Sequence, residues 1–179
     1  GDVYKRQGGY LIEFWLKPAV VALGVPLYLQ LEAIKKQLVP ILLSQLAGCI
    51  IGVVSVVVIA KLMGAPQEII YSLAPKSVTT PIAMEVADTL GGIPALTAAV
   101  VVCVGLLGSI VGIKTLKLTR IKSPIAQGLS LGAAAHAVGT STAMDISSKY
   151  GAYASLGLTL NGIFTALLTP TILRLLGLL

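Results

Sequence analysis

Three long stretches of the chain contain no charged residue, and they constrain the fold more than any other feature. They are Gln37–Ala60, Thr89–Ile113 and Tyr150–Leu173. Each exceeds the roughly 20 apolar residues that an α-helix needs to span a bilayer. Only 11% of all residues are charged, against about 25% in ordinary soluble domains, and so short a chain could not bury this much apolar surface in water. The sequence therefore predicts an all-α membrane protein, a multi-span helical bundle.

The start of the chain differs in character from the remainder. Gly1–Gln7 reads GDVYKRQ and is polar, so we interpret it as a non-native or linker-like start. Residues 8–179 are interpreted as a single transmembrane domain that lacks its N-terminal part. A shorter uncharged stretch, Pro18–Leu31, is interrupted by Pro26 and could complete a kinked helix.

Two further apolar segments, Gln67–Leu90 and Pro124–Lys149, are interrupted near their centres. The first contains Pro75 and Pro81, and the second contains a run of glycine and hydroxyl residues. Such residues leave backbone groups without helical partners, and lipid cannot satisfy those groups. We therefore expect both breaks to be buried in protein or to line a wet cavity.

The two interrupted segments resemble each other at an offset of 60 residues, where VTTPIAME in one matches VGTSTAMD in the other. We interpret them as a duplication, with repeat 1 at about 37–93, repeat 2 at about 94–150 and a final span at 150–179. Coincidence in a biased composition is the alternative. The identical pairs are Ala74/Ala134, Val78/Val138, Thr80/Thr140, Ala83/Ala143, Met84/Met144, Gly91/Gly151 and Leu96/Leu156.

Basic residues predict the orientation in the membrane. Lys35 and Lys36 precede the first uncharged stretch, and a second cluster from Lys114 to Lys122 follows the next one. Cytoplasmic loops are enriched in Lys and Arg, so both clusters are placed inside, and the first broken segment must begin and end outside. By analogy the second begins and ends inside. Two inverted repeats, each containing a broken or re-entrant helix, are typical of secondary transporters.

Lys76 and His136 occupy equivalent positions in the two repeats, and each lies just before a break. Ionisable groups at membrane depth are costly and usually functional, and two of them beside half-helix N-termini would suit a carboxylate. The alternatives are that Lys76 extends to the membrane interface and that His136 packs against a carbonyl. Hydroxyls that could donate to the carboxylate are those of Thr79, Thr80, Thr140, Ser141 and Thr142.

Glu85 and Asp145 are also equivalent, nine residues after Lys76 and His136. They could pair with those cations or carry a coupling proton. They could equally end half-helices at the wet boundary of the membrane.

Glycine is abundant, with 19 residues, and three pairs are spaced four apart: Gly48/Gly52, Gly108/Gly112 and Gly128/Gly132. Small residues at this spacing let helix backbones approach closely in a membrane. We expect these pairs to be packing contacts, although chance spacing is the alternative.

Several function classes are disfavoured. The chain has one histidine and no cluster of metal-ligating residues, so we expect no metal and no cofactor. No nucleophile elbow or phosphate-binding loop is present, and we do not expect an enzyme. The net charge of +6 comes mostly from residues between apolar segments, which set topology and do not indicate nucleic acid. Cys49 and Cys103 lie in apolar runs and are expected to pack as small side chains.

Three motifs of the chain are distinctive: LKPAVVALGVPLYLQL near the start, LAPKSVTTPIAMEVADTLGGIPALTAAVVV at the first break and RIKSPIAQGLSLGAAAHAVGTSTAM at the second. Together they resemble the LrgB/CidB family of bacterial inner-membrane proteins. The resemblance implies a multi-pass protein of the bacterial plasma membrane with a small LrgA/CidA-type membrane partner; a homo-oligomer is left open. The family often has an Arg shortly after its Gly-Thr pair, where this chain has Ser141, Thr142 and Ala143. The family's characteristic residues fall on Pro75, Lys76, Ser77, Thr79, Thr80, Pro81, His136, Gly139 and Thr140.

The resemblance implies two functions, and the residues favour one of them. Family members are described as holin/antiholin-like modulators of murein hydrolase activity, autolysis and cell lysis, whereas relatives that include a plastid glycolate/glycerate translocator move small monocarboxylates such as pyruvate or glycolate. Broken helices are not needed for a nonselective lesion, so the sequence favours a secondary transporter. A structural subunit that scaffolds its partner is the third hypothesis.

Overall fold

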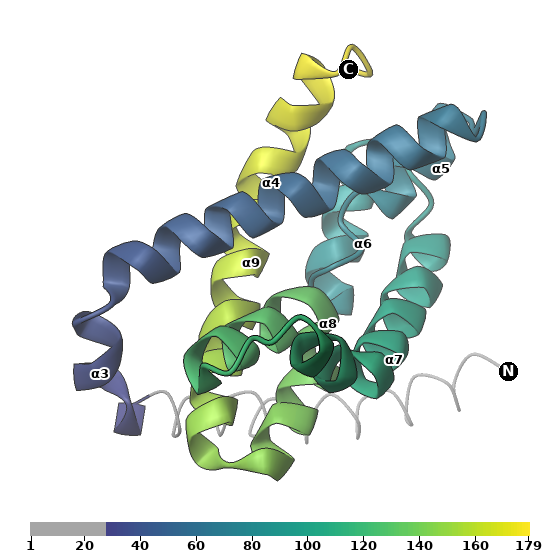
Figure 1. Ribbon diagram of the computed structural model, residues 1–179. Coiled ribbons are helices and arrows are strands. Elements are labelled where there is room, and N and C mark those ends of the chain that lie inside the picture. The colour runs from purple at the N-terminus through teal and green to yellow at the C-terminus, as the bar shows by residue number, and fades with distance from the viewer. Residues whose placement is uncertain (1–27) are drawn as a thin grey trace, which may run out of the picture.

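The structure is a computed structural model, which describes residues 28–179. All regular structure in this part of the chain is helical (Figure 1). The predictions for the polar start and for most of Pro18–Leu31 lie outside the described residues. The helices are α3 (Leu31–Lys35), α4 (Leu38–Leu62), α5 (Gln67–Leu73), α6 (Thr80–Thr89), α7 (Pro94–Leu118), α8 (Pro124–Ile146) and α9 (Ser148–Leu175).

Three helices, α4, α7 and α9, are long and apolar enough to cross a membrane. They have 25, 25 and 28 residues, and 25 residues of helix extend about 37 Å. They confirm the three spans predicted from the uncharged stretches. α7 begins later than Thr89 because Gly91 has a φ of 82° and Pro94 occupies the first helical turn.

The first interrupted segment forms two short helices, α5 and α6, joined through residues 74–79. The seven and ten residues of these helices extend about 10 Å and 15 Å, so neither can cross a hydrocarbon core of about 30 Å. Ser72 of α5 links the segment to the start of α7: Ile93 N–H donates to its Oγ (2.7 Å), and the Thr97 hydroxyl donates to its carbonyl (3.0 Å). The segment therefore leaves and rejoins the bundle beside the beginning of α7.

The second interrupted segment, α8, doubles back on itself at His136. His136 has a non-helical φ of 42° and ψ of −131°. A Cβ built on Gly139 would overlap the carbonyl oxygen of Leu131, whereas eight residues of straight helix would separate these positions by about 12 Å. Leu131 and Ala143 also belong to one buried cluster. α8 is thus a hairpin of two half-helices, each too short to span the bilayer.

Small residues let the α8 hairpin pack closely against the two long helices beside it, α7 and α9. A Cβ on Gly108 would lie 2.5 Å from Ala135 Cβ, and one on Gly112 would lie 2.8 Å from Leu131 Cδ2. A Cβ on Gly128 would lie 2.7 Å from the Tyr150 carbonyl oxygen of α9, and Gly132 faces the Ala154 backbone. The packing role predicted for these two glycine pairs is confirmed.

The packing role predicted for the third pair, Gly48 and Gly52, is wrong. Nothing lies within 4 Å of a Cβ built on either residue. Both residues instead line a cavity, so the absence of side chains here leaves open space beside α4.

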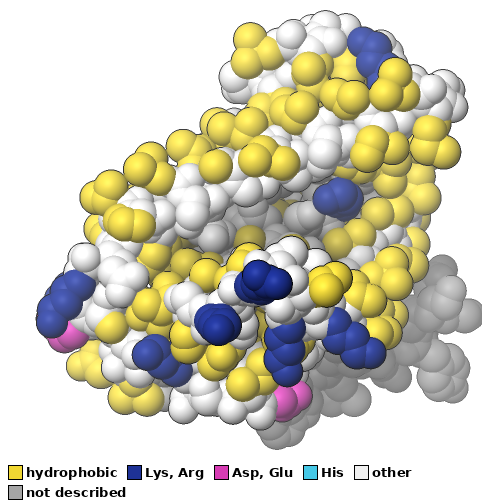
Figure 2. Space-filling model, in the orientation of Figure 1, with side chains coloured by type: hydrophobic (Ala, Val, Ile, Leu, Met, Phe, Trp, Pro, Cys, Tyr) yellow, Lys and Arg dark blue, Asp and Glu magenta, His cyan; other side chains and the backbone are white. Residues whose placement is uncertain are grey.

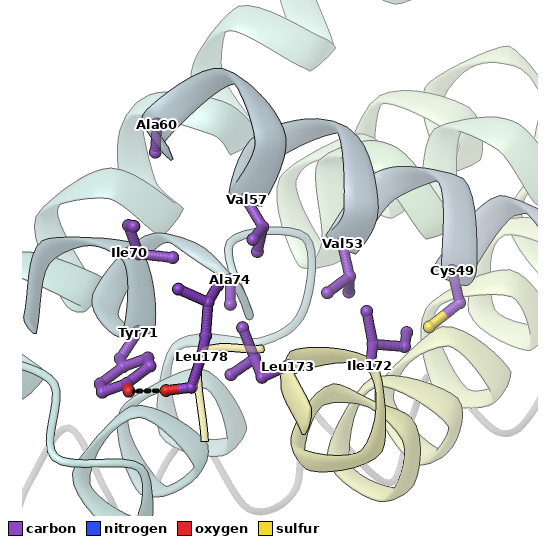
Figure 3. Close-up of a cluster of buried hydrophobic side chains, with 10 residues drawn as sticks. All are labelled: Cys49, Val53, Val57, Ala60, Ile70, Tyr71, Ala74, Ile172, Leu173 and Leu178. Atoms are coloured by element: carbon purple, nitrogen blue, oxygen red, sulfur yellow. Dashed lines mark hydrogen bonds between the residues drawn. The ribbon is translucent and has the colours of Figure 1, made fainter. Parts of the chain in front are cut away.

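The C-terminal halves of α4 and α9 pack together in a buried apolar cluster (Figure 3). α4 contributes Val53, Val57 and Ala60, which face Ile70 of α5 and Leu173 of α9. The Tyr71 hydroxyl donates a hydrogen bond to the carbonyl of Leu178, which ties α5 to the C-terminal end of the chain. We call these residues, together with Cys49, Ala74, Ile172 and Leu178, the apical cluster.

Figure 1 shows the path that these contacts create. α4 runs from the α3 end of the molecule to the end that carries α5, α7 runs back, and α9 runs out again toward the C-terminus. This path has three crossings and two interrupted segments between them. The common origin of the two segments, their inverted relation and the repeat boundaries stay predictions.

Candidate functional site

Asn161 joins the two interrupted segments near the middle of α9. Its Nδ2 donates to the Ser77 carbonyl (2.8 Å) and to the Ala133 carbonyl (3.0 Å). Ser77 lies in the connection between α5 and α6, and Ala133 lies in the last turn of the first α8 half-helix. Carbonyls at helix ends lack an intrahelical donor, and Asn161 supplies one to each.

The interrupted segments meet a second time at Val101 of α7. Val78, from the first break, packs with Val101 and Ala83 in one buried cluster. His136, at the tip of the second hairpin, donates from Nε2 to the Val101 carbonyl at 2.8 Å. Gly105, one turn later on α7, leaves the space that the imidazole occupies, because a Cβ there would lie 2.6 Å from His136 Cε1. The long helices α7 and α9 thus each contact both breaks.

A cavity of about 590 Å³ lies between α4, the first half of α8, the first break and α9. Figure 2 shows the hollow beneath the ridge formed by α4. Its wall along α4 is built from Ser44, Gln45, Gly48, Cys49 and Gly52. The other lining residues are Gln37, Pro40, Ile41, Val53, Ala74, Lys76, Ser77, Ser123, Ile125, Ala126, Leu129, Ser130, Ala133, Ala134, Asn161 and Thr165.

Among the described residues that line the cavity, Lys76 is the only charged one and none is a carboxylate. Its side chain is half-buried, and Nζ donates to Ser77 Oγ at 3.0 Å. Both donor protons of Asn161 Nδ2 serve backbone carbonyls, and the Ser44 hydroxyl donates to the Ile41 carbonyl at 2.9 Å. The donors that remain for a ligand in the cavity include the Lys76 ammonium group and the hydroxyls of Ser130 and Thr165. This arrangement suits a small anion with a single negative charge.

His136 does not share the cavity with Lys76. Its side chain is buried and points to α7, where it binds the Val101 carbonyl. Of the two arrangements considered for His136, binding a carboxylate and packing against a carbonyl, the structure shows the second. The hydroxyl of Thr140 donates to the His136 carbonyl at 2.9 Å, which supports the backbone turn beside this residue. The positive φ of His136 concentrates backbone strain at the tip of the hairpin.

The other residues predicted from sequence lie around the breaks but outside the cavity lining. Pro75, Gly139 and Thr140 are buried, whereas Pro81 and Ser141 are exposed. Thr79 and Thr80 are half-buried at the start of α6, and the half-buried Thr142 donates to the Val138 carbonyl. Of the predicted substrate-binding residues, the cavity brings together Lys76 and Ser77.

Glu85 and Asp145 are both exposed, on α6 and at the end of α8. Neither lines the cavity that contains Lys76. A coupling role and a place at the wet boundary of the membrane both stay predictions.

Sequence reasoning missed several polar residues of the cavity, among them Ser44, Gln45, Ser130 and Thr165. Gln45 is 5% exposed, and its Oε1 has no hydrogen-bond partner among the described residues. A usable signal was present, because Gln45 and Cys49 on α4, and Asn161 and Thr165 on α9, are four residues apart. That spacing places each pair on one helix face. In residues 28–179 no group of three His, Cys, Asp or Glu residues is placed to hold a metal.

Comparison with known proteins identifies relatives across nearly the whole chain. The model of the LrgB-like family matches residues 2–175. Over 172 residues the chain is 40% identical to the uncharacterized protein YwbG of Bacillus subtilis, covering 96% of this chain and 76% of that protein. It is 36% identical to the antiholin-like protein LrgB of Bacillus mycoides, covering 96% and 75%. No solved structure matches.

Proposed function

Because the chain belongs to the LrgB-like family, we propose that it is an antiholin-like modulator of murein hydrolase activity and lysis in the bacterial plasma membrane. The observation that carries this proposal is its 36% and 35% identity to relatives named antiholin-like protein LrgB. The three membrane-spanning helices suit a protein that acts from within the bilayer. The murein substrate lies outside, so control must pass through a partner or through the state of the membrane.

A small LrgA/CidA-type membrane protein is the proposed partner. The outer side of α4 offers an apolar surface for such a helical protein, with Leu43, Ile51 and Ile59 between 57% and 67% exposed. Lipid tails are as apolar as these side chains, so hydrophobicity alone does not drive association of helices in a membrane. Close packing with the partner would have to supply the specificity.

The lysis proposal is tested in bacterial cells that lack the native gene pair for this protein and its partner. Restoring both proteins should lower the release of murein hydrolase activity and slow autolysis after energy depletion. The matched control restores the partner alone. Equal hydrolase release and equal lysis rates with and without this protein would contradict the proposal.

A second candidate function, secondary transport of small monocarboxylates of the pyruvate or glycolate type, is favoured by one specific observation. Within residues 28–179, the half-buried Lys76 is the only charged residue that lines a cavity formed at two interrupted segments. Interrupted helices at a midplane cavity are where carriers bind substrates, and an intramembrane cation is a functional hypothesis by default. Because the described lining holds one cation and no carboxylate, a substrate with one negative charge would balance it.

The transport candidate is tested by uptake of labelled pyruvate or glycolate into vesicles containing this protein and its partner. Lys76→Met removes the charge and keeps the length of the side chain, so we expect uptake to fall at least tenfold, while Lys76→Arg should retain a substantial part. Lys114→Met is the matched control, because Lys114 is exposed at the end of α7. Unchanged uptake in Lys76→Met would remove this residue from the mechanism.

The two functions are compatible if carboxylate flux changes the membrane energetics that govern lysis. Lys76→Met separates the possibilities, because it should abolish uptake in either case. Lysis control that survives in this variant would be independent of transport. Loss of both activities would make flux the route of control.

A further inference from the structure

The cavity has two unlike ends, and this asymmetry has a functional consequence. At one end it is lined by Gln37, Pro40 and Ser123, all exposed, at the beginnings of α4 and α8. At the other end it is lined by Asn161 and Thr165, which are 3% and 2% exposed. The cavity therefore runs from an exposed end, which we call the mouth, to a buried end, which we call the floor and where Lys76 and Ser77 lie.

The mouth lies at the end of the molecule that carries the basic clusters. Lys36 directly precedes Gln37, and Lys122 directly precedes Ser123, so both exposed lysines flank the lining residues of the mouth. Lys35 is also nearby, although its Nζ is paired with Glu32 at 3.2 Å. Figure 2 shows Lys and Arg side chains concentrated around this end. A ring of one sign of charge raises the local concentration of ions of the opposite sign, and basic loops mark the cytoplasmic face.

Beyond the floor, the route to the other face is closed by the apical cluster (Figure 3). Cys49, Val53 and Ala74 belong both to this cluster and to the cavity lining, so the two are continuous. The next residues, Val57 and Leu173, are 1% and 0% exposed. The hydrogen bond from Tyr71 to the Leu178 carbonyl holds the cluster closed across α5 and the chain end. A hydrated ion cannot pass such a packed apolar layer.

We propose that the cavity is a one-sided anion-binding vestibule, which loads a small monoanion from the basic face and is sealed toward the opposite face by the apical cluster. Lys36 and Lys122 concentrate the anion at the mouth, and Lys76 with Ser77 and Thr165 receives it at the floor. A sideways opening between α4 and α8 gives no route from water, because the surrounding hydrocarbon excludes ions. The ligand class rests on the proposed transport function, whereas the sidedness rests on geometry alone.

Cysteine accessibility tests the sidedness without requiring transport. In a Cys49→Ser, Cys103→Ser background, Ser44→Cys and Ala134→Cys place a thiol at two exposed positions of the cavity wall. Thr119→Cys marks the basic face and Ala95→Cys marks the opposite face, since both residues are exposed near the two ends of α7. Each variant is treated, with its partner present, in right-side-out and inverted vesicles with membrane-impermeant thiosulfonate reagents.

We expect both cavity cysteines to react only from the side that labels Thr119→Cys. At each position we compare the reaction rate of an anionic ethylsulfonate reagent with that of its trimethylammonium counterpart of similar size. This anion-to-cation rate ratio should be at least threefold higher at the two cavity cysteines than at Ala95→Cys. Millimolar pyruvate should slow the reaction. Labelling from the Ala95 side, from both sides or from neither side would overturn the vestibule. Correct sidedness without protection by pyruvate would retain the vestibule and reject the carboxylate as its ligand.

Discussion

At the scale of single residues, Asn161 and Lys76 have different tasks at the floor of the cavity. Asn161 uses both protons of its amide nitrogen on carbonyls, one from each interrupted segment. Lys76 contributes the charge and is oriented by Ser77 Oγ. Because Asn161 occupies the two carbonyls, they do not compete with an anion for the ammonium group. We therefore assign Asn161 as a positioning residue.

The loss of the Asn161 amide should destabilise the junction between the two breaks. Interhelical hydrogen bonds in membrane proteins contribute about 0.6 kcal/mol on average, so Asn161→Ala should lower the unfolding free energy by about 1–2 kcal/mol for two bonds plus lost packing. The measurement is unfolding in mixed micelles of increasing denaturing detergent. Thr159→Ala is the control, because its hydroxyl bonds within its own helix to the Ser155 carbonyl. Equal effects of both substitutions would contradict the junction.

Lys76 and the break around it could be predicted from sequence, because their residue types are unusual in an apolar segment. Lys76 stands out because a charge in an apolar segment is costly, and Pro75 and Pro81 locate its break. The direction of the His136 side chain was not predictable, because it depends on the space left by Gly105 of α7. Gln45 and Thr165 were missed because uncharged polar residues are common in spanning helices, and only the packing of α4 against α9 makes them neighbours of one cavity.

At the scale of helices, α8 shows most clearly how a break changes the fold. Its two half-helices lie against each other, and its tip reaches Val101 and Gly105 of α7. Glycine and alanine residues of α7, α8 and α9 allow the tip of α8 to come this close to α7, since larger side chains would keep the helix backbones apart. The interruption was predicted from the glycine and hydroxyl run, but the sharp turn at His136 was not, because it depends on tertiary contacts of the imidazole.

The hairpin shape of α8 predicts a short distance between its ends. Spin labels at Ser123→Cys and Ser147→Cys, both exposed, would be about 36 Å apart if α8 were straight. We expect a pulsed electron-spin distance clearly below that value. Ala95→Cys with Thr119→Cys on α7 is the matched control, with the same sequence separation in one continuous helix. Similar distances for the two pairs would show that α8 is not folded back.

The close approach of α8 and α9 predicts a contrast between two glycines. Gly132→Ala places a methyl group against the Ala154 backbone, and overpacking of this kind costs about 1–3 kcal/mol. Gly48→Ala meets nothing within 4 Å, so we expect its unfolding free energy to change little. Detergent-induced unfolding measures both variants. A smaller loss for Gly132→Ala than for Gly48→Ala would be incompatible with this packing.

At the scale of the whole molecule, the spans α4 and α9 and the two interrupted segments form one cavity with a basic mouth and a closed apolar end. The number of spans was predictable because uncharged stretches of bilayer length are unambiguous. The cavity was not, because its wall combines α4, α8 and α9, which are distant in sequence. Its volume of about 590 Å³ lies in the range of small-molecule sites. The two proposed functions thus depend on one architectural feature, the meeting of both breaks.

The most direct test of that meeting is cross-linking between the breaks in native membranes. Ser77→Cys and Ala133→Cys, in the Cys49→Ser, Cys103→Ser background, bring together two residues whose carbonyls share one amide nitrogen. A short bifunctional thiosulfonate reagent should join them within a single chain. Ser77→Cys with Thr119→Cys should remain unlinked, because Thr119 lies more than four helical turns beyond Val101 on α7. Failure of the first pair to cross-link, while each single cysteine is labelled, would contradict the convergence of the two breaks.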